Sequence, residues 1–318
     1  MKNDFIIVGI VLTAVGLMIF AGALIAAGFD FSRLATAKYE TNTLTADGEF
    51  DKIEIYTKST DIVFKQSDNG EFSAVIEETS KVKHAVSVTD GTLSIAAEDK
   101  RTWIDHISFF QKSLTMTLYL PSSAFESLKI ECGTGDVSVP DFLSFGNAEI
   151  SVSTGDVIFK APECGALKIK TSTGDIKLDG IHAESVDLSV STGKIEGKNI
   201  TSEGALSARV STGKTELTDV ICKSFASKGT TGAITLKDVI AADFIKIERS
   251  TGDVRFENSD AEEIFVTAST GDVTGTLRTP KTFIANTSTG KKKLPETTGG
   301  ECRITTTTGD IIIELSVN

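Results

Sequence analysis

A Thr-Gly dipeptide recurs ten times in register between Thr134 and Gly309 of this 318-residue chain, each of these copies 19 or 20 residues after the previous one. A fixed period of this length is typical of a solenoid, in which each repeat buries its apolar side only against its neighbours. The repeat therefore predicts an all-β body, a parallel β-helix-like solenoid of ten coils. The ten turn glycines are Gly135, Gly155, Gly174, Gly193, Gly213, Gly232, Gly252, Gly271, Gly290 and Gly309.

Positions counted from each glycine indicate which side chains face inward, because alternation with a period of two marks one face of a strand. The residue seven positions before the glycine is apolar in all ten repeats, and the residue five before it is apolar in all but Ser227. The columns two and four positions after it are also mostly apolar, with Thr215 and Lys292 as exceptions in the first and Gly197 and Gly275 in the second. Each repeat is thus predicted to form a short strand, a Thr-Gly turn, a second short strand and a returning loop.

Glycine suits this turn because a sharp bend needs a positive φ, which glycine adopts without a steric penalty. Thr precedes the glycine in all ten repeats, and Ser precedes that Thr in seven of them. Stacked coils lie about 4.8 Å apart, so these hydroxyl groups are predicted to form a ladder along one edge of the solenoid. Each hydroxyl could donate to the next one and bond the turn amides.

A short strand, a tight turn and a second strand are also the signal of a β-hairpin. In that alternative the repeats would pair antiparallel, as in a β-prism or a β-sandwich. The solenoid is favoured because regular columns across ten repeats require neighbouring copies to stack in one register.

Residues 5–29, which follow a short flank (1–4), form 25 uncharged and mostly apolar positions. As a helix that rises about 1.5 Å per residue, they would cross a hydrocarbon core of about 30 Å, which predicts a single-pass transmembrane anchor. A cleavable signal peptide is the alternative, since Ala35-Thr36-Ala37 resembles a cleavage site, but the apolar core of such peptides has only about 7–15 residues. The flanking charges barely differ, and we expect the carboxy-terminal body to lie outside the cytoplasm.

A linker (30–45) and a capping β region (46–125) are predicted to separate the anchor from the solenoid repeats (126–318). Residues 53–64 match the column spacing of a repeat with Thr60 in place of the glycine, which predicts a degenerate first coil. Residues 86–95, with Asp90-Gly91 at their centre, predict a β-hairpin, and residues 116–120 before Pro121 predict a further strand.

Residues 98–112 interrupt this pattern and carry five large apolar side chains, Trp103, Ile104, Ile107, Phe109 and Phe110. Because the ends of a solenoid must be covered, this segment is predicted to close the exposed end of the core. A membrane-facing or partner-binding loop is the alternative, since exposed apolar loops often mark contact sites.

The cysteines and histidines form no recognisable catalytic or metal-binding constellation, and no cofactor is predicted. Cys132, Cys164, Cys222 and Cys302 have no CxxC spacing and no histidine pair nearby. They are predicted to be small buried hydrophobic residues, and four unpaired cysteines fit an extracellular body less comfortably than a cytoplasmic one. The three histidines fall in separate contexts with no nucleophile beside them, so no triad is predicted.

Asp follows the glycine in six repeats, a pattern that could bind calcium. The β-rolls that bind calcium through Gly-Asp turns have a nine-residue repeat with further ligands. Here Lys194, Lys214, Ala233 and Lys291 interrupt the column, and each coil offers a single carboxylate. The aspartates are therefore predicted to be solvated turn residues that pair with neighbouring lysines.

The apolar amino-terminal segment, the Phe50–Ile55 opening, the Leu118–Pro121 segment and the Ser-Thr-Gly-Asp repeats together resemble the bacterial putative-adhesin family of membrane-anchored β-strand-repeat proteins, a domain of unknown function. The resemblance covers about residues 40–318. It implies a β-solenoid, usually membrane-attached, which some members link to envelope-stress signalling or surface contact. It implies no catalytic residues.

The sequence thus predicts a non-enzymatic binding or scaffold module at the bacterial cell envelope, with the membrane and an unknown envelope protein or glycan as partners. A formal net charge of −12 argues against a nucleic-acid partner. A polysaccharide-acting β-helix enzyme is one alternative, although repeats of nearly constant length leave no loops to build a cleft. The other is a cytoplasmic polymer-forming scaffold, in which terminal strands such as 311–317 would associate end to end.

Overall fold

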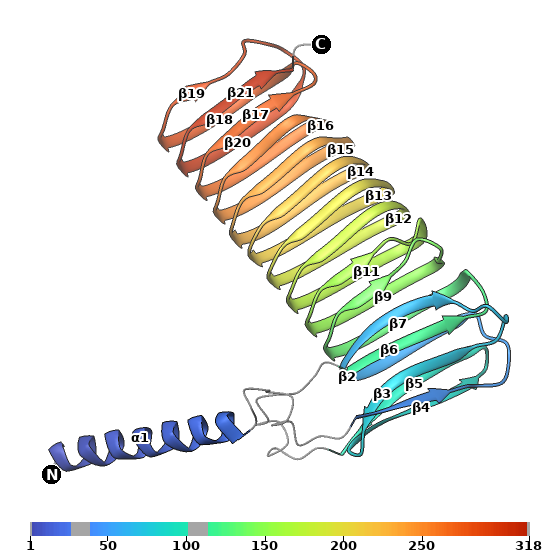
Figure 1. Ribbon diagram of the computed structural model, residues 1–318. Helices are drawn as coiled ribbons and strands as arrows, with labels where there is room; N and C mark the ends of the chain where they lie inside the picture. Colours follow the sequence, from blue (N-terminus) through green and yellow to red (C-terminus); the bar gives the residue numbers. More distant parts are fainter. Residues whose placement is uncertain (1, 27–38, 101–113, 317–318) are drawn as a thin grey trace.

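The computed structural model describes residues 2–26, 39–100 and 114–316 (Figure 1). One helix is followed by twenty-one strands, and hydrogen bonds join all of these strands into a single sheet that winds into a stack of coils. The predicted all-β solenoid is therefore confirmed for the described part of the chain.

Helix α1 (Lys2–Ala26) contains most of the apolar segment 5–29. Its side chains between Val11 and Phe20 include many large apolar groups that are more than 40% exposed. Among the helical residues described in full, no stretch is long and apolar enough to cross a membrane. The structure therefore does not support the transmembrane anchor at 5–29, which stays a prediction.

Strands that pair antiparallel with one another cover the amino-terminal end of the stack. They are β1 (Tyr39–Leu44), β3 (Ser73–Thr79), β4 (Val82–Thr89), β5 (Thr92–Asp99) and β6 (Leu114–Leu120). Two of them, β5 and β6, also pair in parallel with the first rung of the stack. β4 and β5 form the predicted hairpin, and both residues of its turn have positive φ, 49° at Asp90 and 73° at Gly91. β6 confirms the strand predicted before Pro121, while β1 pairs with β3 and β3 with β6.

The degenerate first coil is also confirmed, as β2 (Lys52–Gln66). This strand pairs in parallel with the first regular repeat, so that Ile55 lies opposite Ile130 and Ile62 opposite Val137. Ile55 and Ile62 are fully buried. The column spacing therefore identified a rung that lacks the turn glycine.

The regular repeats contribute the remaining strands. They are β7 (Ala124–Thr134), β8 (Val137–Val139), β9 (Ser144–Thr154), β10 (Val157–Phe159), β11 (Glu163–Thr173), β12 (Ile176–Thr192), β13 (Ile195–Thr212), β14 (Thr215–Thr231), β15 (Ile234–Thr251), β16 (Val254–Thr270), β17 (Val273–Leu277), β18 (Lys281–Thr289), β19 (Lys292–Lys293), β20 (Gly300–Thr308) and β21 (Ile311–Leu315).

All of these repeat strands pair in parallel, which excludes the antiparallel hairpin alternative. Equivalent columns lie opposite one another, as Ile130 does to Ile150 and Ile150 to Ile169. These three side chains are at most 1% exposed, and the aliphatic columns continue as one buried core from β2 to β21. Each rung thus buries its apolar side against the next, as the repeat period predicted.

The returning segment of the central repeats differs from the predicted loop, because it is itself a strand with a second corner. The corner residue stands six positions after the turn glycine and has a positive φ of 52–71°. Left-handed backbone is accessible to Gly, Asn and Asp at low cost, and every corner uses one of them. The corner residues are Gly180, Asn199, Asp219, Asp238 and Asn258.

The order of the last two coils corrects the prediction that successive copies stack in sequence. β20 lies between β16 and β18, since Cys302 is opposite both Ile264 and Phe283. β21 lies likewise between β17 and β19, so the strand Ile311–Leu315 is not at the end of the stack. Cys302 is fully buried, whereas Phe283 is only partly buried. The more polar coil around Gly290 therefore forms the end of the stack, where its weaker apolar columns expose less hydrocarbon to water.

Candidate functional site

The turn edge of the solenoid is a regular surface that runs along the stacked repeats. Nine of the ten turn glycines have φ between 127° and 146°, Gly290 being the exception. Each turn lies directly over the turn of a neighbouring rung: a Cβ atom built on any of these ten glycines would stand only 1.8–2.3 Å from a backbone oxygen of that rung. Glycine is thus required by the close approach of the coils as well as by φ.

Two hydroxyl residues per rung are exposed along this edge. They occupy the two positions before the turn glycine from the second repeat onward, beginning with Ser153 and Thr154. Among the described residues, Thr289, which donates to the carbonyl of Thr307 at 3.5 Å, is the one member of these pairs whose hydroxyl group has a protein partner. The predicted hydroxyl ladder is therefore present as a row of exposed groups, but its members do not bond each other or the turn amides.

Aspartates and backbone carbonyls bond the turn amides instead. The amide of Asp156 donates to Oδ1 of Asp136 at 2.8 Å, and the amide of Asp175 donates in the same way to Asp156. The chain of bonds continues to the amide of Lys194 and resumes between Asp253 and Asp272. Each carboxylate thus bonds an amide of the adjacent rung, along the direction of the stack. The exposed hydroxyl groups of the described rungs make no such bond to a turn amide.

The hydrogen bonds of the aspartate column also concern the alternative that these residues bind calcium. Each of these aspartates commits one oxygen to an amide of the adjacent rung. In the described part of the chain, no three His, Cys, Asp or Glu side chains gather where they could hold a metal ion. The aspartate column thus has a structural partner, the backbone of the next coil.

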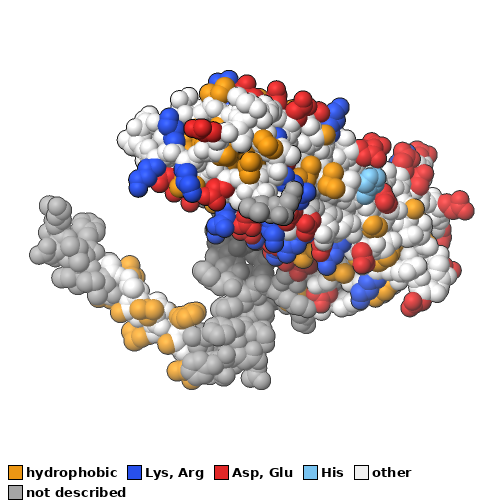
Figure 2. All heavy atoms as spheres, turned by 90° about the horizontal axis from the view of Figure 1, so that it is seen from above, with side chains coloured by type: hydrophobic (Ala, Val, Ile, Leu, Met, Phe, Trp, Pro, Cys, Tyr) orange, Lys and Arg blue, Asp and Glu red, His pale blue; other side chains and the backbone are white. Residues whose placement is uncertain are grey.

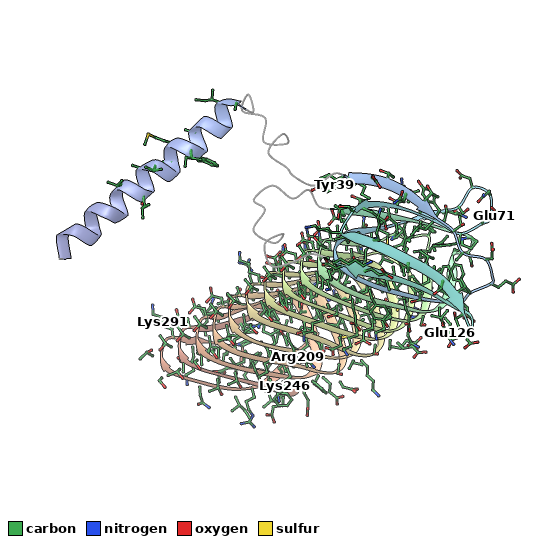
Figure 3. The ribbon with its side chains drawn as sticks, turned by 90° about the horizontal axis from the view of Figure 1, so that it is seen from below. Tyr39, Glu71, Glu126, Arg209, Lys246 and Lys291 are labelled. Carbon is green, nitrogen blue, oxygen red and sulfur yellow. The ribbon has the colours of Figure 1, made fainter. Side chains whose placement is uncertain are left out.

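Acidic and basic side chains alternate on the outer face beside the turn edge, and both signs are interspersed on the face shown in Figure 2. Lys168 Nζ lies 2.7 Å from Glu149 Oε1, and Arg209 Nη1 lies 2.7 Å from Asp187 Oδ1. The hydrogen bond from Lys168 lowers the pKa of Glu149. Arg209 and Lys246 lie on the central coils and Lys291 near the far end (Figure 3). Exposed pairs of this kind add little stability, so their main effect on this face is to present charge of both signs.

The four cysteines are buried and free, as predicted. Burial raises the pKa of Cys132 to about 11 and the pKa of Cys164, Cys222 and Cys302 to about 12. A thiol with so high a pKa carries almost no thiolate at neutral pH, and the thiolate is the reactive form. These side chains therefore act as small apolar residues of the core.

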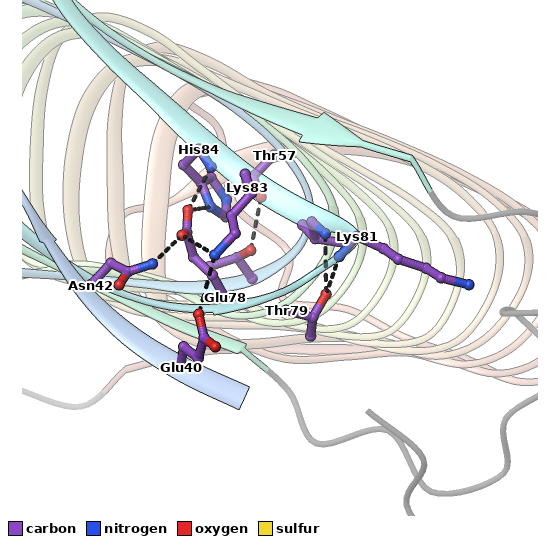
Figure 4. A network of polar contacts seen from close by, with 10 residues as sticks. Glu40, Asn42, Thr57, Glu78, Thr79, Lys81, Lys83 and His84 are labelled. Carbon is purple, nitrogen blue, oxygen red and sulfur yellow. Dashed lines mark hydrogen bonds and ion pairs between the residues drawn. The ribbon is translucent and has the colours of Figure 1, made fainter. Parts of the chain in front are cut away.

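The capping strands contain a buried polar network that the sequence analysis did not predict (Figure 4). Glu78 accepts hydrogen bonds from Asn42 Nδ2 at 2.6 Å and from the backbone amide of His84, and its Oε1 lies 3.2 Å from His84 Nδ1. Lys83 Nζ is 3.3 Å from the same carboxylate. The alternating strand pattern gave a signal, since Glu78 and His84 occupy inward positions of β3 and β4.

The two central groups of this network have shifted pKa values. Burial raises the pKa of Glu78, but the hydrogen bonds from Asn42, His84 and Lys83 outweigh it and leave the pKa below its usual value. Burial lowers the pKa of His84, and its contact with Glu78 offsets this only in part. The network therefore holds a charged Glu78 beside a neutral His84. The Nε2 atom of His84 is buried with no hydrogen-bond partner among the described residues.

The predicted interaction loop, with Trp103, Ile104, Ile107, Phe109 and Phe110, lies outside the described residues. His106 lies there as well, while His182 is exposed on the solenoid with Nδ1 at 2.9 Å from Glu163. The described residues thus bring the turn glycines together in one column and leave the apolar loop untested.

Parallel rungs, a continuous aliphatic core and a long exposed hydroxyl edge define a β-solenoid repeat protein. The chain belongs to the Toastrack DUF4097 family, whose model matches residues 50–218 and 208–316. This confirms the resemblance to putative adhesins of the β-repeat type.

Two solved structures are similar to this chain at low sequence identity. A putative adhesin from Bacteroides fragilis NCTC 9343 is 18% identical, with coverage of 87% of this chain and 97% of that one and a TM-score of 0.47. A putative adhesin from Parabacteroides merdae ATCC 43184 is 15% identical, with the same coverage and a TM-score of 0.46. The curated proteins contain no match to this chain.

Proposed function

We propose that this protein is a non-catalytic, membrane-anchored binding module of the bacterial cell envelope, whose solenoid contacts its ligand through the exposed hydroxyl edge. The observation that carries the proposal is the double row of Ser and Thr side chains that are exposed on successive rungs and almost all without a protein partner. A free hydroxyl can both donate and accept a hydrogen bond, so the row presents unused bonding capacity in one direction.

The chemistry of this edge fits an extended, repetitive polar polymer such as a glycan. The rungs repeat about every 4.8 Å, so a chain laid along the stack would meet an equivalent pair of hydroxyl groups at each step. The adjacent aspartate and lysine side chains would add charged contacts at fixed intervals. Binding energy would then be spread over many weak contacts, as in multivalent recognition.

The apolar segment at 5–29 is the reason for proposing a place at the envelope. Residues 5–29 contain no charged side chain, and a helix of that length matches the thickness of a hydrocarbon core. We propose that this segment holds the protein in the membrane with the solenoid on the extracytoplasmic side. One accessible cysteine, introduced as Thr230→Cys in a chain that lacks the four native cysteines, tests the side: an impermeant maleimide should label it in intact cells. Labelling only after lysis would contradict this orientation.

A series of Ser→Ala substitutions tests the binding edge. The probe is insoluble peptidoglycan, with the full-length protein in detergent and binding measured by co-sedimentation. One substitution, Ser191→Ala, should change the dissociation constant less than twofold, because a single hydroxyl is one of many equal contacts. Five substitutions, at positions 153, 172, 191, 211 and 250, should weaken binding at least tenfold.

The control for this series is five Ser→Ala changes at exposed or half-exposed serines away from the edge, which should leave binding unchanged. Loss of all binding in Ser191→Ala would point to a localised site instead of a distributed one. Equal binding by the fivefold edge variant and the wild type would exclude the edge as the glycan contact.

A further inference from the structure

Arg249 places a guanidinium group inside the core of the solenoid. It stands three positions before Gly252, in an inward column, and is 4% exposed. Its Nη2 donates to Ser227 Oγ at 2.9 Å and to Thr215 Oγ1 at 3.2 Å. Its Nε and Nη1 are buried with no hydrogen-bond partner. A single side chain thus reaches past one rung to the next and leaves two nitrogen atoms unbonded.

The neighbouring rungs carry small side chains where the other rungs have large ones. The column that holds Ala208 and Ser227 is mostly Ile, Leu or Val, and the column of Thr215 is otherwise mostly Val or Ile. Gly229 lies opposite Arg249 in the parallel register, and a Cβ atom at Gly229 would overlap Nη1. These departures, scattered in the sequence, therefore belong to one polar cluster around the guanidinium group.

The cluster contains donors without matching acceptors. No carboxylate among the described residues pairs with Arg249, and burial lowers its pKa to about 10, which leaves it charged at neutral pH. The Ser227 hydroxyl already donates to the carbonyl of Ala208 at 3.0 Å. The Thr215 hydroxyl accepts from Arg249 and has no acceptor of its own in the described structure. A buried positive charge surrounded by free N–H and O–H groups calls for a negative acceptor, because an uncompensated buried charge is strongly destabilising.

We propose that Arg249, with Thr215, binds one monovalent anion of halide size inside the solenoid. One of the two free nitrogens of Arg249, whose N–H bonds point in different directions, and the Thr215 hydroxyl would donate to it, while the small residues at 208, 227 and 229 make room for the guanidinium group. A carboxylate or phosphate ligand is less suitable, since its extra oxygens would meet the aliphatic columns on either side. Water is the competing occupant, and the experiment separates the two.

The test compares halides with a bulky anion at constant ionic strength. The full-length protein in detergent is heated in sodium gluconate, sodium chloride or sodium bromide, and the unfolding midpoint is followed by circular dichroism. If the halide binds only the folded state, chloride and bromide should raise the midpoint by about 2–5 °C over gluconate. Arg249→Met should abolish this difference, because a buried charge can often be replaced by an apolar residue of similar volume without unfolding.

Arg209→Met is the matched control, since Arg209 is an exposed arginine of the same body. It should retain the full halide effect, which separates a specific ion from general salt effects on the surface. Crystals of the wild-type protein grown in bromide should show an anomalous peak within hydrogen-bond distance of Arg249, a result that does not depend on any variant folding.

Two outcomes would overturn the proposal. One is a halide-dependent midpoint that persists unchanged in Arg249→Met. The other is a bromide crystal in which the position beside Arg249 has no anomalous signal and holds water.

Discussion

The close contact between turns makes a quantitative prediction for Gly193→Ala. Gly193 has a φ of 143°, and a Cβ atom added to it would lie 2.1 Å from the carbonyl oxygen of Gly174 on the adjacent rung. The backbone on both sides would have to separate by about 1 Å to reach an ordinary contact distance. Hydrogen bonds flank this point, from Gly174 to Thr192 at 3.0 Å and from Ile176 to Lys194 at 2.9 Å.

The expected cost follows from these two effects. A non-glycine residue held in this part of backbone space is strained by about 1–3 kcal/mol. Weakening two hydrogen bonds between rungs costs about 1 kcal/mol each. Gly193→Ala should therefore lower the free energy of unfolding by about 3–5 kcal/mol.

Gly180→Ala provides the matched control within the same repeat. Gly180 also has a positive φ, 71°, but nothing lies within 4 Å of the position that its Cβ atom would occupy. This variant should pay only the left-handed backbone penalty of about 1–2 kcal/mol. The lower entropy of an unfolded chain with alanine affects both variants alike and cancels in the comparison.

Urea unfolding of the full-length protein, followed by far-UV circular dichroism, measures both variants against the wild type. We expect Gly193→Ala to be less stable than Gly180→Ala by about 2–3 kcal/mol. Equal destabilisation would show that the turn requires glycine only for its φ, and the argument from close packing of the coils would be wrong.

Three further predictions address the ends of the stack. Deletion of residues 300–318 removes an interior rung of the stack. The coil around Gly290, which packs against that rung, should then become sensitive to limited proteolysis at a protease dose that leaves the wild type intact. Continued resistance would contradict the observed rung order. Lys292 covers the last rung of the stack by donating to the carbonyl of Ala285 at 3.3 Å. Lys292→Ile should expose the edge of that rung and promote concentration-dependent association, measured by sedimentation velocity. An unchanged mass would show that this lysine does not protect the edge. The pKa of His84 is lower in the folded protein than in the unfolded chain, so the unfolded state takes up a proton first as pH falls below about 6.5. The protein should therefore be less stable at pH 5.5 than at pH 7.5, and His84→Phe should reduce that difference. An identical pH dependence in both proteins would exclude His84 as its source.

Periodicity made much of the fold predictable. The aliphatic columns, the turn glycines and the rung in which Thr60 replaces glycine all follow from counting residues, because a strand alternates its side chains with a period of two. The hairpin at Asp90-Gly91 follows from local turn chemistry, since both residues must adopt positive φ. These features depend on neighbours in the sequence or on a constant offset from the glycine.

The second corner of each central repeat and the hydrogen-bond partners along the turn edge were harder to predict from the sequence. A column of Gly, Asn and Asp six residues after the turn glycine was present in the sequence and would have indicated the corner. The exposed Ser and Thr rows were located correctly, but their hydrogen bonds were not. The reason is geometric: the side chain of Asp136 reaches the amide of the next rung, and that bond leaves the hydroxyls to the solvent.

The sequence by itself determined the architecture, because a fixed period with fixed apolar offsets dictates which side of every rung faces inward. Only the tertiary structure decided which rungs are neighbours. Near-identical coils can stack in more than one order, and the free energy that selects among the orders comes from the ends, where the coil around Gly290 exposes less apolar surface than the coil around Gly309 would. The same limit applies to Arg249, whose polar partners Ser227 and Thr215 lie on other rungs and become one cluster only when those rungs are stacked in register.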